Sequence, residues 1–155
     1  MLNAKQLIEL IIDPALKDLV MYSEFASDLL VFTCATESAG GTYIKQLKGP
    51  ALGIYQMEPT TYNDIWQNYI KGKNDLQQIL LYNFEASRMP SEDRLIYDLR
   101  FATAMTRIYY ARIKDPLPKL ASLDNLWNYY KTYYNTELGK ADYHRALDAY
   151  MEFIS

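Results

Sequence analysis

The uneven distribution of glycine and proline constrains the fold of this chain more than any other feature of its sequence. Four of the six glycines fall between positions 40 and 53, and prolines stand at positions 50 and 59. Glycine adopts backbone conformations that helices exclude, and proline lacks the N–H that a helix interior needs. We therefore predict an irregular segment at about 40–59, whereas the sequence on both sides keeps apolar residues at helical spacing.

Capping residues delimit the expected helices. Ser23 can accept a hydrogen bond from the first turn of a helix, and Asp13 can cap another that has Pro14 in its first turn. Thr60 or Thr61 is expected to start the helix after the irregular segment. The expected helices span about 4–12, 14–22, 23–37, 61–69, 74–84, 91–113, 124–134 and 141–153.

The composition suits one compact domain. Half of the 155 residues are apolar, which is enough for a sizeable core without disulfides or metals. Linkers, repeats and low-complexity stretches do not divide the sequence. The sequence therefore predicts one mainly α domain over 1–155, with a small irregular or β lobe at about 40–59.

Cysteine and histidine limit the chemistry. Cys34 is the only cysteine, so it cannot form an intrachain disulfide, and its apolar surroundings are typical of a buried side chain. His144, the single histidine, lies far along the chain and gives no sign of a Cys–His pair. A single histidine also excludes most zinc sites, and we predict neither a metal nor a cofactor.

Charge and hydropathy exclude further classes of protein. The net charge is −3 without a basic stripe, which argues against nucleic-acid binding. The sequence lacks the run of about eighteen apolar residues that a membrane span needs. Glu9 and Asp13 interrupt the N-terminal segment, which therefore does not resemble a signal peptide, and we expect synthesis in a cytoplasm.

Glu37 is the candidate for acid catalysis. It is predicted at the C-terminal end of an apolar helix, where burial and the negative end of the helix dipole both raise the pKa of a carboxyl group. A carboxylic acid that stays protonated near neutral pH can protonate a leaving group, as cleavage of a glycosidic bond requires. The alternative is a solvated glutamate at a helix end.

The residues around this glutamate resemble a known family. Glu37 and Ser38 are followed by the block 51–56, Ala-x-Gly-Ile-x-Gln. This pattern resembles the Glu-Ser pair and the Gly-Ala-x-Gly-Leu-x-Gln block of soluble-lytic-transglycosylase-type domains in the lysozyme-like superfamily. Pro50 replaces the family's first glycine, and Gly49 stands one place earlier, as a single-residue insertion would leave it. The resemblance implies a lysozyme-like fold that cleaves peptidoglycan.

The block suggests roles for single residues. Gly53 allows the backbone to turn and a ligand to approach. On an extended strand Gln56 and Glu58 would point to one side and Tyr55 to the other. Gln56 could then hydrogen-bond a sugar or its N-acetyl group, or instead brace the loop as a structural amide. The resemblance also assigns Ser38 and Tyr55 to substrate binding.

A second motif of the family is matched near the C-terminus. Segment 133–139 resembles a Tyr-Asn motif followed by glycine, on a helix that returns to the cleft. The resemblance implies that Tyr134 hydrogen-bonds the catalytic carboxyl group or a neighbouring sugar, and that Asn135 lines the cleft. Tyr130 and Tyr133 compete for the role of Tyr134.

The number of carboxylates distinguishes two reactions. A hydrolase commonly needs a second carboxylate for water, whereas a lytic transglycosylase needs one, because the muramic 6-hydroxyl attacks internally and closes a 1,6-anhydro ring. Glu58 and Asp64 are the nearest acids after Glu37, and only Glu58 shares the strand face of Gln56. This pattern favours a lytic transglycosylase that cleaves the MurNAc–GlcNAc bond. The alternatives are a muramidase-type hydrolase (lysozyme), a chitinase-like glycosidase, and a non-catalytic lysozyme-fold protein of a virion or for glycan binding.

Segment 49–60 looks most like versions of this domain that tailed bacteriophages encode. That likeness implies peptidoglycan glycan strands as the partner, together with other virion proteins. It also implies a protein that is made in the host cytoplasm and acts in the periplasm or at the cell wall, as an endolysin or as part of the virion.

Overall fold

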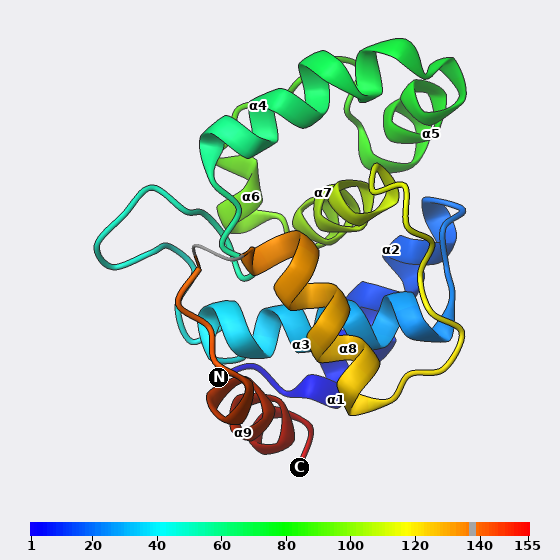
Figure 1. Ribbon diagram of the computed structural model, residues 1–155. Helices are drawn as coiled ribbons and strands as arrows, with labels where there is room; N and C mark the ends of the chain where they lie inside the picture. Colours follow the sequence, from blue (N-terminus) through cyan, green and yellow to red (C-terminus); the bar gives the residue numbers. More distant parts are fainter. Residues whose placement is uncertain (137–138) are drawn as a thin grey trace.

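The computed structural model of the protein describes residues 1–136 and 139–155 (Figure 1). Their fold is mainly α-helical, as predicted. The α-helices are α1 (Ala4–Leu7), α2 (Asp13–Asp18), α3 (Glu24–Ser38), α4 (Pro59–Asn68), α5 (Asn74–Phe84), α6 (Arg94–Tyr97), α7 (Leu99–Ala111), α8 (Leu123–Tyr130) and α9 (Tyr143–Ile154). The π-helical turns Ile8–Ile12 and Lys131–Asn135 continue α1 and α8, and the 3-10 turn Ile70–Gly72 follows α4.

Helices α3 and α7 form the centre of the fold. Figure 1 shows α4, α5 and α6 on one side of α7, with α3, α8 and α9 toward the other. Helix α7 contacts α2, α3, α4 and α6, while α3 also contacts α8 and α9. One hydrophobic core cluster takes residues from α1 through α9, and Phe32 and Phe101 are fully enclosed in it. Within the part of the chain that the structure describes, no helix is both long and apolar enough to cross a membrane.

Local signals set the position of α3. The side chain of Ser23 accepts a hydrogen bond from the backbone N–H of Ala26 at 3.0 Å, so the predicted cap is confirmed. The helix ends at Ser38, where Ala39 turns into the left-handed conformation with φ 51°. The predicted end of this helix near Glu37 is therefore confirmed, and Glu37 lies in its last turn.

The buried face of α3 carries Cys34. Its side chain is fully enclosed, as predicted, and burial raises the pKa of the thiol to about 12. At neutral pH the residue is therefore a thiol rather than a nucleophilic thiolate. Cys34 acts as a small core residue next to the catalytic candidate.

The break predicted at Asp13 is wrong, because the backbone stays helical from Ala4 to Asp18. A proline ring inside a helix presses on the carbonyl group four residues earlier. The wider π-helical turn Ile8–Ile12 precedes Pro14 and relieves that contact, so the helix continues past the proline.

Two other helix boundaries also differ from the prediction. Helix α4 begins at Pro59 rather than after Thr60 or Thr61, since proline suits the first position of a helix. The helix predicted over 91–113 is divided at Asp98. The carboxylate of Asp98 accepts a hydrogen bond at 2.9 Å from the first turn of α7 and caps that helix instead of lying inside a longer one.

Residues 40–58 form the irregular lobe, which projects beside the end of α3 in Figure 1. Isolated antiparallel bridges join Leu52 to Lys45 and to Met57. The extended strand expected to carry Tyr55, Gln56 and Glu58 is wrong. Gly53 with φ +77° and Gln56 with φ 51° turn the chain sharply instead. The absence of a side chain at Gly53 also leaves room for the backbone of Leu95 in α6.

Gly53→Ala should lower the free energy of unfolding by roughly 2 kcal/mol or more. A Cβ there would lie 2.2 Å from the backbone oxygen of Leu95, and the positive φ adds strain for any L side chain. Urea unfolding followed by circular dichroism measures the change. Gly72→Ala is the matched control, because its Cβ meets nothing within 4 Å. Equal unfolding midpoints for the two variants would contradict the contact assigned to Gly53.

Candidate functional site

A cleft of about 790 Å³ opens between the irregular lobe, the start of α4 and the π-helical turn after α8. Glu37, Gln56, Tyr134 and Asn135 all line it, although they come from three separate parts of the sequence. The fold thus brings together four of the residues that the sequence singled out. Glu58 also lines the cleft, at an exposed position.

Glu37 is partly buried at the end of α3, and its Oε1 accepts a hydrogen bond from the hydroxyl of Tyr130 at 2.9 Å. Burial raises the pKa of Glu37 to about 7, and the hydrogen bond from Tyr130 acts in the opposite direction. Near neutral pH the carboxyl group can therefore both donate and accept a proton. A single group with this property can act as acid in one step and as base in the next.

Aromatic rings fix the hydroxyl that faces Glu37. The ring of Tyr130 stacks on Tyr134, with 6.0 Å between centroids, and meets Phe32 edge-on at 5.5 Å. Burial and the neighbouring Glu37 carboxylate both raise the pKa of Tyr130. The phenol therefore stays protonated and remains a donor to Glu37 across the neutral range.

The hydrogen bond predicted from Tyr134 to Glu37 is made by Tyr130 instead. Tyr134 donates its hydroxyl proton to the backbone oxygen of Tyr55, which joins the π-helical turn to the lobe. Tyr133, the other competitor, donates to Asp115 at 2.7 Å. The π-helical turn changes which way successive side chains face, and an expected α-helix through position 134 does not predict that change.

Gln56 lines the cleft from the sharp turn in the lobe. Its side-chain nitrogen donates to the backbone oxygen of Gly53 at 2.9 Å. This bond braces the turn, which is one of the two roles predicted for the residue. The position of Gln56 in the same cleft as Glu37 leaves the other role, a contact to a sugar, as a prediction.

Ser38 lies beneath the cleft rather than in it. It is fully enclosed, donates its hydroxyl proton to the backbone oxygen of Ile54 at 2.6 Å, and accepts from the backbone N–H of Gly41 at 2.9 Å. These bonds fasten the lobe to the end of α3. The contacts of Ser38 are thus structural, in place of the substrate binding that the resemblance implied.

Tyr55 and Gly53 also support the lobe from inside. Tyr55 is enclosed, and its hydroxyl shares a hydrogen bond of 2.8 Å with Thr103 of α7. The close neighbour that Gly53 admits is the backbone of Leu95, not a ligand. Both residues set the position of the turn. The two-sided alternation of side chains that a strand would impose does not apply to Tyr55.

Asn135 lines the cleft. Its side-chain oxygen accepts from Lys131 at 2.7 Å and from the backbone N–H of Ala141 at 3.3 Å. These contacts connect the π-helical turn to the segment before α9. Glu137 and Leu138, which belong to the same sequence motif, lie outside the described residues.

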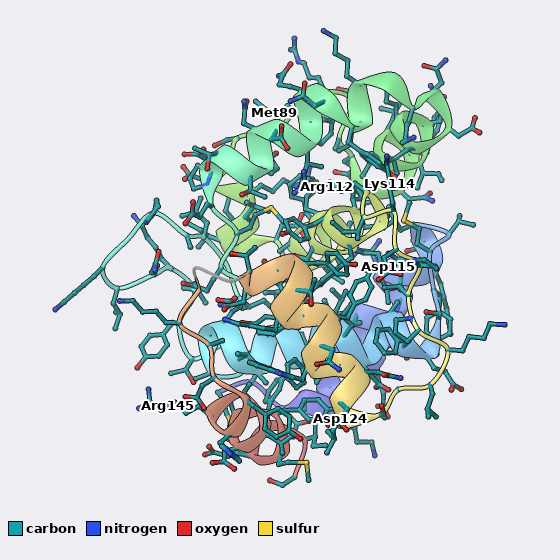
Figure 2. All side chains as sticks on the ribbon, in the orientation of Figure 1. Met89, Arg112, Lys114, Asp115, Asp124 and Arg145 are labelled. Atoms are coloured by element: carbon teal, nitrogen blue, oxygen red, sulfur yellow. The ribbon has the colours of Figure 1, made fainter. Side chains whose placement is uncertain are left out.

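The two further acids have different surroundings. Asp64 pairs with Arg112 at 2.8 Å, and Figure 2 shows this arginine between α4 and α7. That carboxylate therefore holds two helices together. Among the described residues that line the cleft, Glu37 and Glu58 are the carboxylates. Over the ranges 1–136 and 139–155, no group of three or more His, Cys, Asp or Glu side chains could hold a metal ion.

Comparisons with protein-family models, with curated proteins and with solved structures found no match to this chain. Its function is therefore inferred from the side chains of the cleft and from their environment.

Glu37→Gln should change how stability depends on pH. Unfolding returns the pKa of this carboxyl group from about 7 to its ordinary 4.5. Between these values the folded protein binds a proton that the unfolded chain releases, so stability falls as pH rises. The gap is worth at most roughly 3 kcal/mol. We expect the variant to match the parent near pH 4 and to exceed its stability by an amount of that order near pH 8.

Chemical denaturation at a series of pH values measures this difference. Glu58→Gln is the control, because it removes an exposed carboxylate from the same cleft. Its stability should run parallel to that of the parent. A Glu37→Gln curve that also runs parallel would show that the carboxyl group is not buried as described.

Proposed function

We propose that the protein is a lysozyme-like enzyme that cleaves the glycan strands of peptidoglycan, as a lytic transglycosylase with Glu37 as its acid and base. The observation that carries the proposal is a partly buried carboxyl group, with a pKa of about 7, in a cleft of about 790 Å³. Such a volume suits a ligand of the size of a disaccharide. The sequence block around Gln56 supports the same assignment.

The first step needs a proton on Glu37. The acid donates it to the oxygen that joins MurNAc to GlcNAc, and that oxygen keeps the electron pair of the breaking C–O bond. GlcNAc leaves as an alcohol. Burial of Glu37 supports this step, because it keeps a useful fraction of the side chain protonated near neutral pH.

In the second step Glu37, now a carboxylate, takes the proton of the muramic 6-hydroxyl. The freed oxygen attacks the anomeric carbon and closes the 1,6-anhydro ring, so the enzyme returns to its starting state. The hydroxyl of Tyr130 orients the carboxyl group through both steps. Gln56 and the exposed ring of Tyr43, which both line the cleft, are the groups available to orient the sugars.

A muramidase-type hydrolase is the second candidate, and Glu58 is the observation that favours it. This carboxylate lines the same cleft as Glu37 and could hold an attacking water. Its exposed position at the rim supports the single-acid reaction over the hydrolase.

The proposal includes the setting implied by the sequence. The protein would be encoded by a tailed bacteriophage and made in the host cytoplasm. It would act on glycan strands in the periplasm or at the cell wall, alone or with other virion proteins.

Glu37→Gln should reduce the clearing of purified peptidoglycan sacculi by about a hundredfold or more, because the amide cannot supply the proton. Turbidity measures the rate, and mass spectrometry of the products identifies the reaction. We expect 1,6-anhydromuramic ends from the parent protein. Full clearing activity in the variant would refute the role of Glu37, and sacculus binding without clearing by the parent would favour the non-catalytic alternative.

Glu58→Gln separates the two reactions in the same assay. In a transglycosylase the variant still forms anhydromuramic ends. Reducing muramic ends from the parent protein, together with their loss in this variant, would establish the hydrolase instead. Cleavage of chitin oligosaccharides at the same rate as sacculi would point to the chitinase-like alternative.

Tyr130→Phe should move the alkaline limb of the pH–activity profile to higher pH. Activity falls as pH rises through about 7, because Glu37 loses the proton that the first step needs. The hydroxyl of Tyr130 stabilises the carboxylate, so its removal raises the pKa of Glu37 further. Tyr133→Phe is the control, since that hydroxyl contacts Asp115. An alkaline limb that stays in place in Tyr130→Phe would contradict the hydrogen bond to Glu37.

A further inference from the structure

The irregular lobe carries a run of side chains that stand outside the core. Residues 42–50 are all exposed, and they include three large apolar side chains. Tyr43 is 43% exposed, Ile44 52% and Leu47 77%. Single exposed apolar residues are common on protein surfaces, whereas three within five positions form the kind of patch that marks an interaction site.

Backbone hydrogen bonds hold this segment outward in a defined shape. The backbone N–H of Gln46 donates to the carbonyl of Ala51 at 2.9 Å, and that of Gly53 donates to the carbonyl of Ile44 at 2.8 Å. The chain between these pairs turns back on itself, and the lobe projects from the body of the molecule in Figure 1. A projecting, braced tip can enter another surface at little cost in conformational entropy.

The segment is positively charged. Lys45 and Lys48 are both exposed, and positions 38–57 contain neither aspartate nor glutamate. The net charge of the protein is −3, so the segment differs in sign from the whole molecule. The acids that flank it are Glu37, which is partly buried, and Glu58, which stands just before α4. Lysine beside exposed apolar side chains matches a surface with an apolar interior and anionic groups at its edge.

A ligand in the main cleft would leave part of this segment uncovered. Tyr43, Leu47 and Lys48 line the cleft, whereas the exposed residues Ile44 and Lys45 do not. Ile44 and Lys45 therefore present one apolar and one cationic side chain to a surface beyond the cleft.

We propose that residues 44–48 dock the protein on the surface of an anionic lipid bilayer. Ile44 and Leu47 enter the boundary between headgroups and acyl chains, and Lys45 and Lys48 contact the lipid phosphates. An attachment by two apolar and two cationic side chains is peripheral and reversible. It does not require glycan cleavage.

Sedimentation with lipid vesicles tests the proposal. The parent protein should bind vesicles of phosphatidylglycerol and phosphatidylcholine at low salt, and roughly tenfold more weakly at high salt or on phosphatidylcholine alone. Ile44→Ser should lower the partition coefficient roughly fivefold and Lys45→Glu roughly tenfold. Failure of the parent to bind anionic vesicles, or equal binding by parent and variants, would overturn the proposal. Cleavage of sacculi is measured separately, so a protein that binds vesicles without cleaving glycan would overturn only the proposed function.

Leu120→Ser and Lys119→Glu are the matched controls. Both residues are exposed in the segment between α7 and α8, which lies on the opposite side of the molecule from the lobe in Figure 1. Each control should bind vesicles as the parent does, and thermal unfolding checks that all four variants fold. Losses in the controls equal to those in the lobe variants would assign binding to overall charge and hydropathy, and would overturn docking by the lobe.

A tryptophan at the tip of the lobe measures insertion. Fluorescence of Leu47→Trp should be quenched by anionic vesicles whose acyl chains carry bromine, after the signal of the parent protein is subtracted. Leu120→Trp should show no such quenching. Equal quenching of the two variants would contradict insertion of the lobe.

Two other occupants of the lobe surface give different results. If Ile44→Ser binds vesicles as the parent does but loses affinity for sacculi, the occupant is a glycan. If it instead changes the oligomeric state in gel filtration, the occupant is a second copy of the chain. Either result would overturn docking on a bilayer.

Discussion

The hydrogen bond from Tyr130 to Glu37 is the contact on which the arrangement of the site depends. It joins the last turn of α3 to the last turn of α8, and the stacked ring of Tyr134 extends the contact to the lobe. The main cleft and a smaller cavity of about 270 Å³ at the start of α9 both open at this point. A change in the packing of α8 on α3 would therefore alter the acid, the lobe and both hollows together.

The same contact balances two opposing effects on Glu37. Burial favours the neutral acid, whereas the phenol hydroxyl favours the carboxylate. Burial alone would keep the group protonated and hinder its return as a base, and a solvated glutamate would seldom hold the proton. At pH values above the pKa of Glu37 the folded protein holds a partly buried carboxylate, and this lowers the free energy of unfolding. A stability cost at one residue is typical of a functional site.

The sequence predicts the local parts of this arrangement well. Ser23 and the glycines after Ser38 define α3, so the placement of Glu37 at a helix end follows from capping rules alone. The glycine-rich lobe follows from the same reasoning. The joint presence of Glu37 with Tyr134 and Asn135 in one cleft is the expectation with the longest reach along the chain, and it rests on a family resemblance rather than on physical rules.

The parts that the sequence does not predict depend on contacts between distant segments. Tyr130, the last residue of α8, bonds to Glu37, while Tyr134 lies in the π-helical turn that follows and bonds to the lobe. Neither helix propensity nor apolar spacing signals such a turn. At the turn, Gly53 lies against the backbone of Leu95, which is far along the chain. The alternation of side chains along a strand is predicted from neighbouring residues alone. It takes no account of a backbone segment from elsewhere in the chain, such as that of Leu95, packed against the same residues.

Ser38 and Tyr55 belong to motifs that the resemblance associates with substrate binding, but their contacts are structural. Ser38 and Tyr55 hold the lobe against α3 and α7, and this support sets the distance between Gln56 and Glu37. A residue can therefore be necessary for a site without touching a ligand. The two hollows that meet at Glu37 also differ in the segments that line them. The lobe that Ser38 and Tyr55 support lines the main cleft, whereas residues from the start of α9 line the smaller cavity.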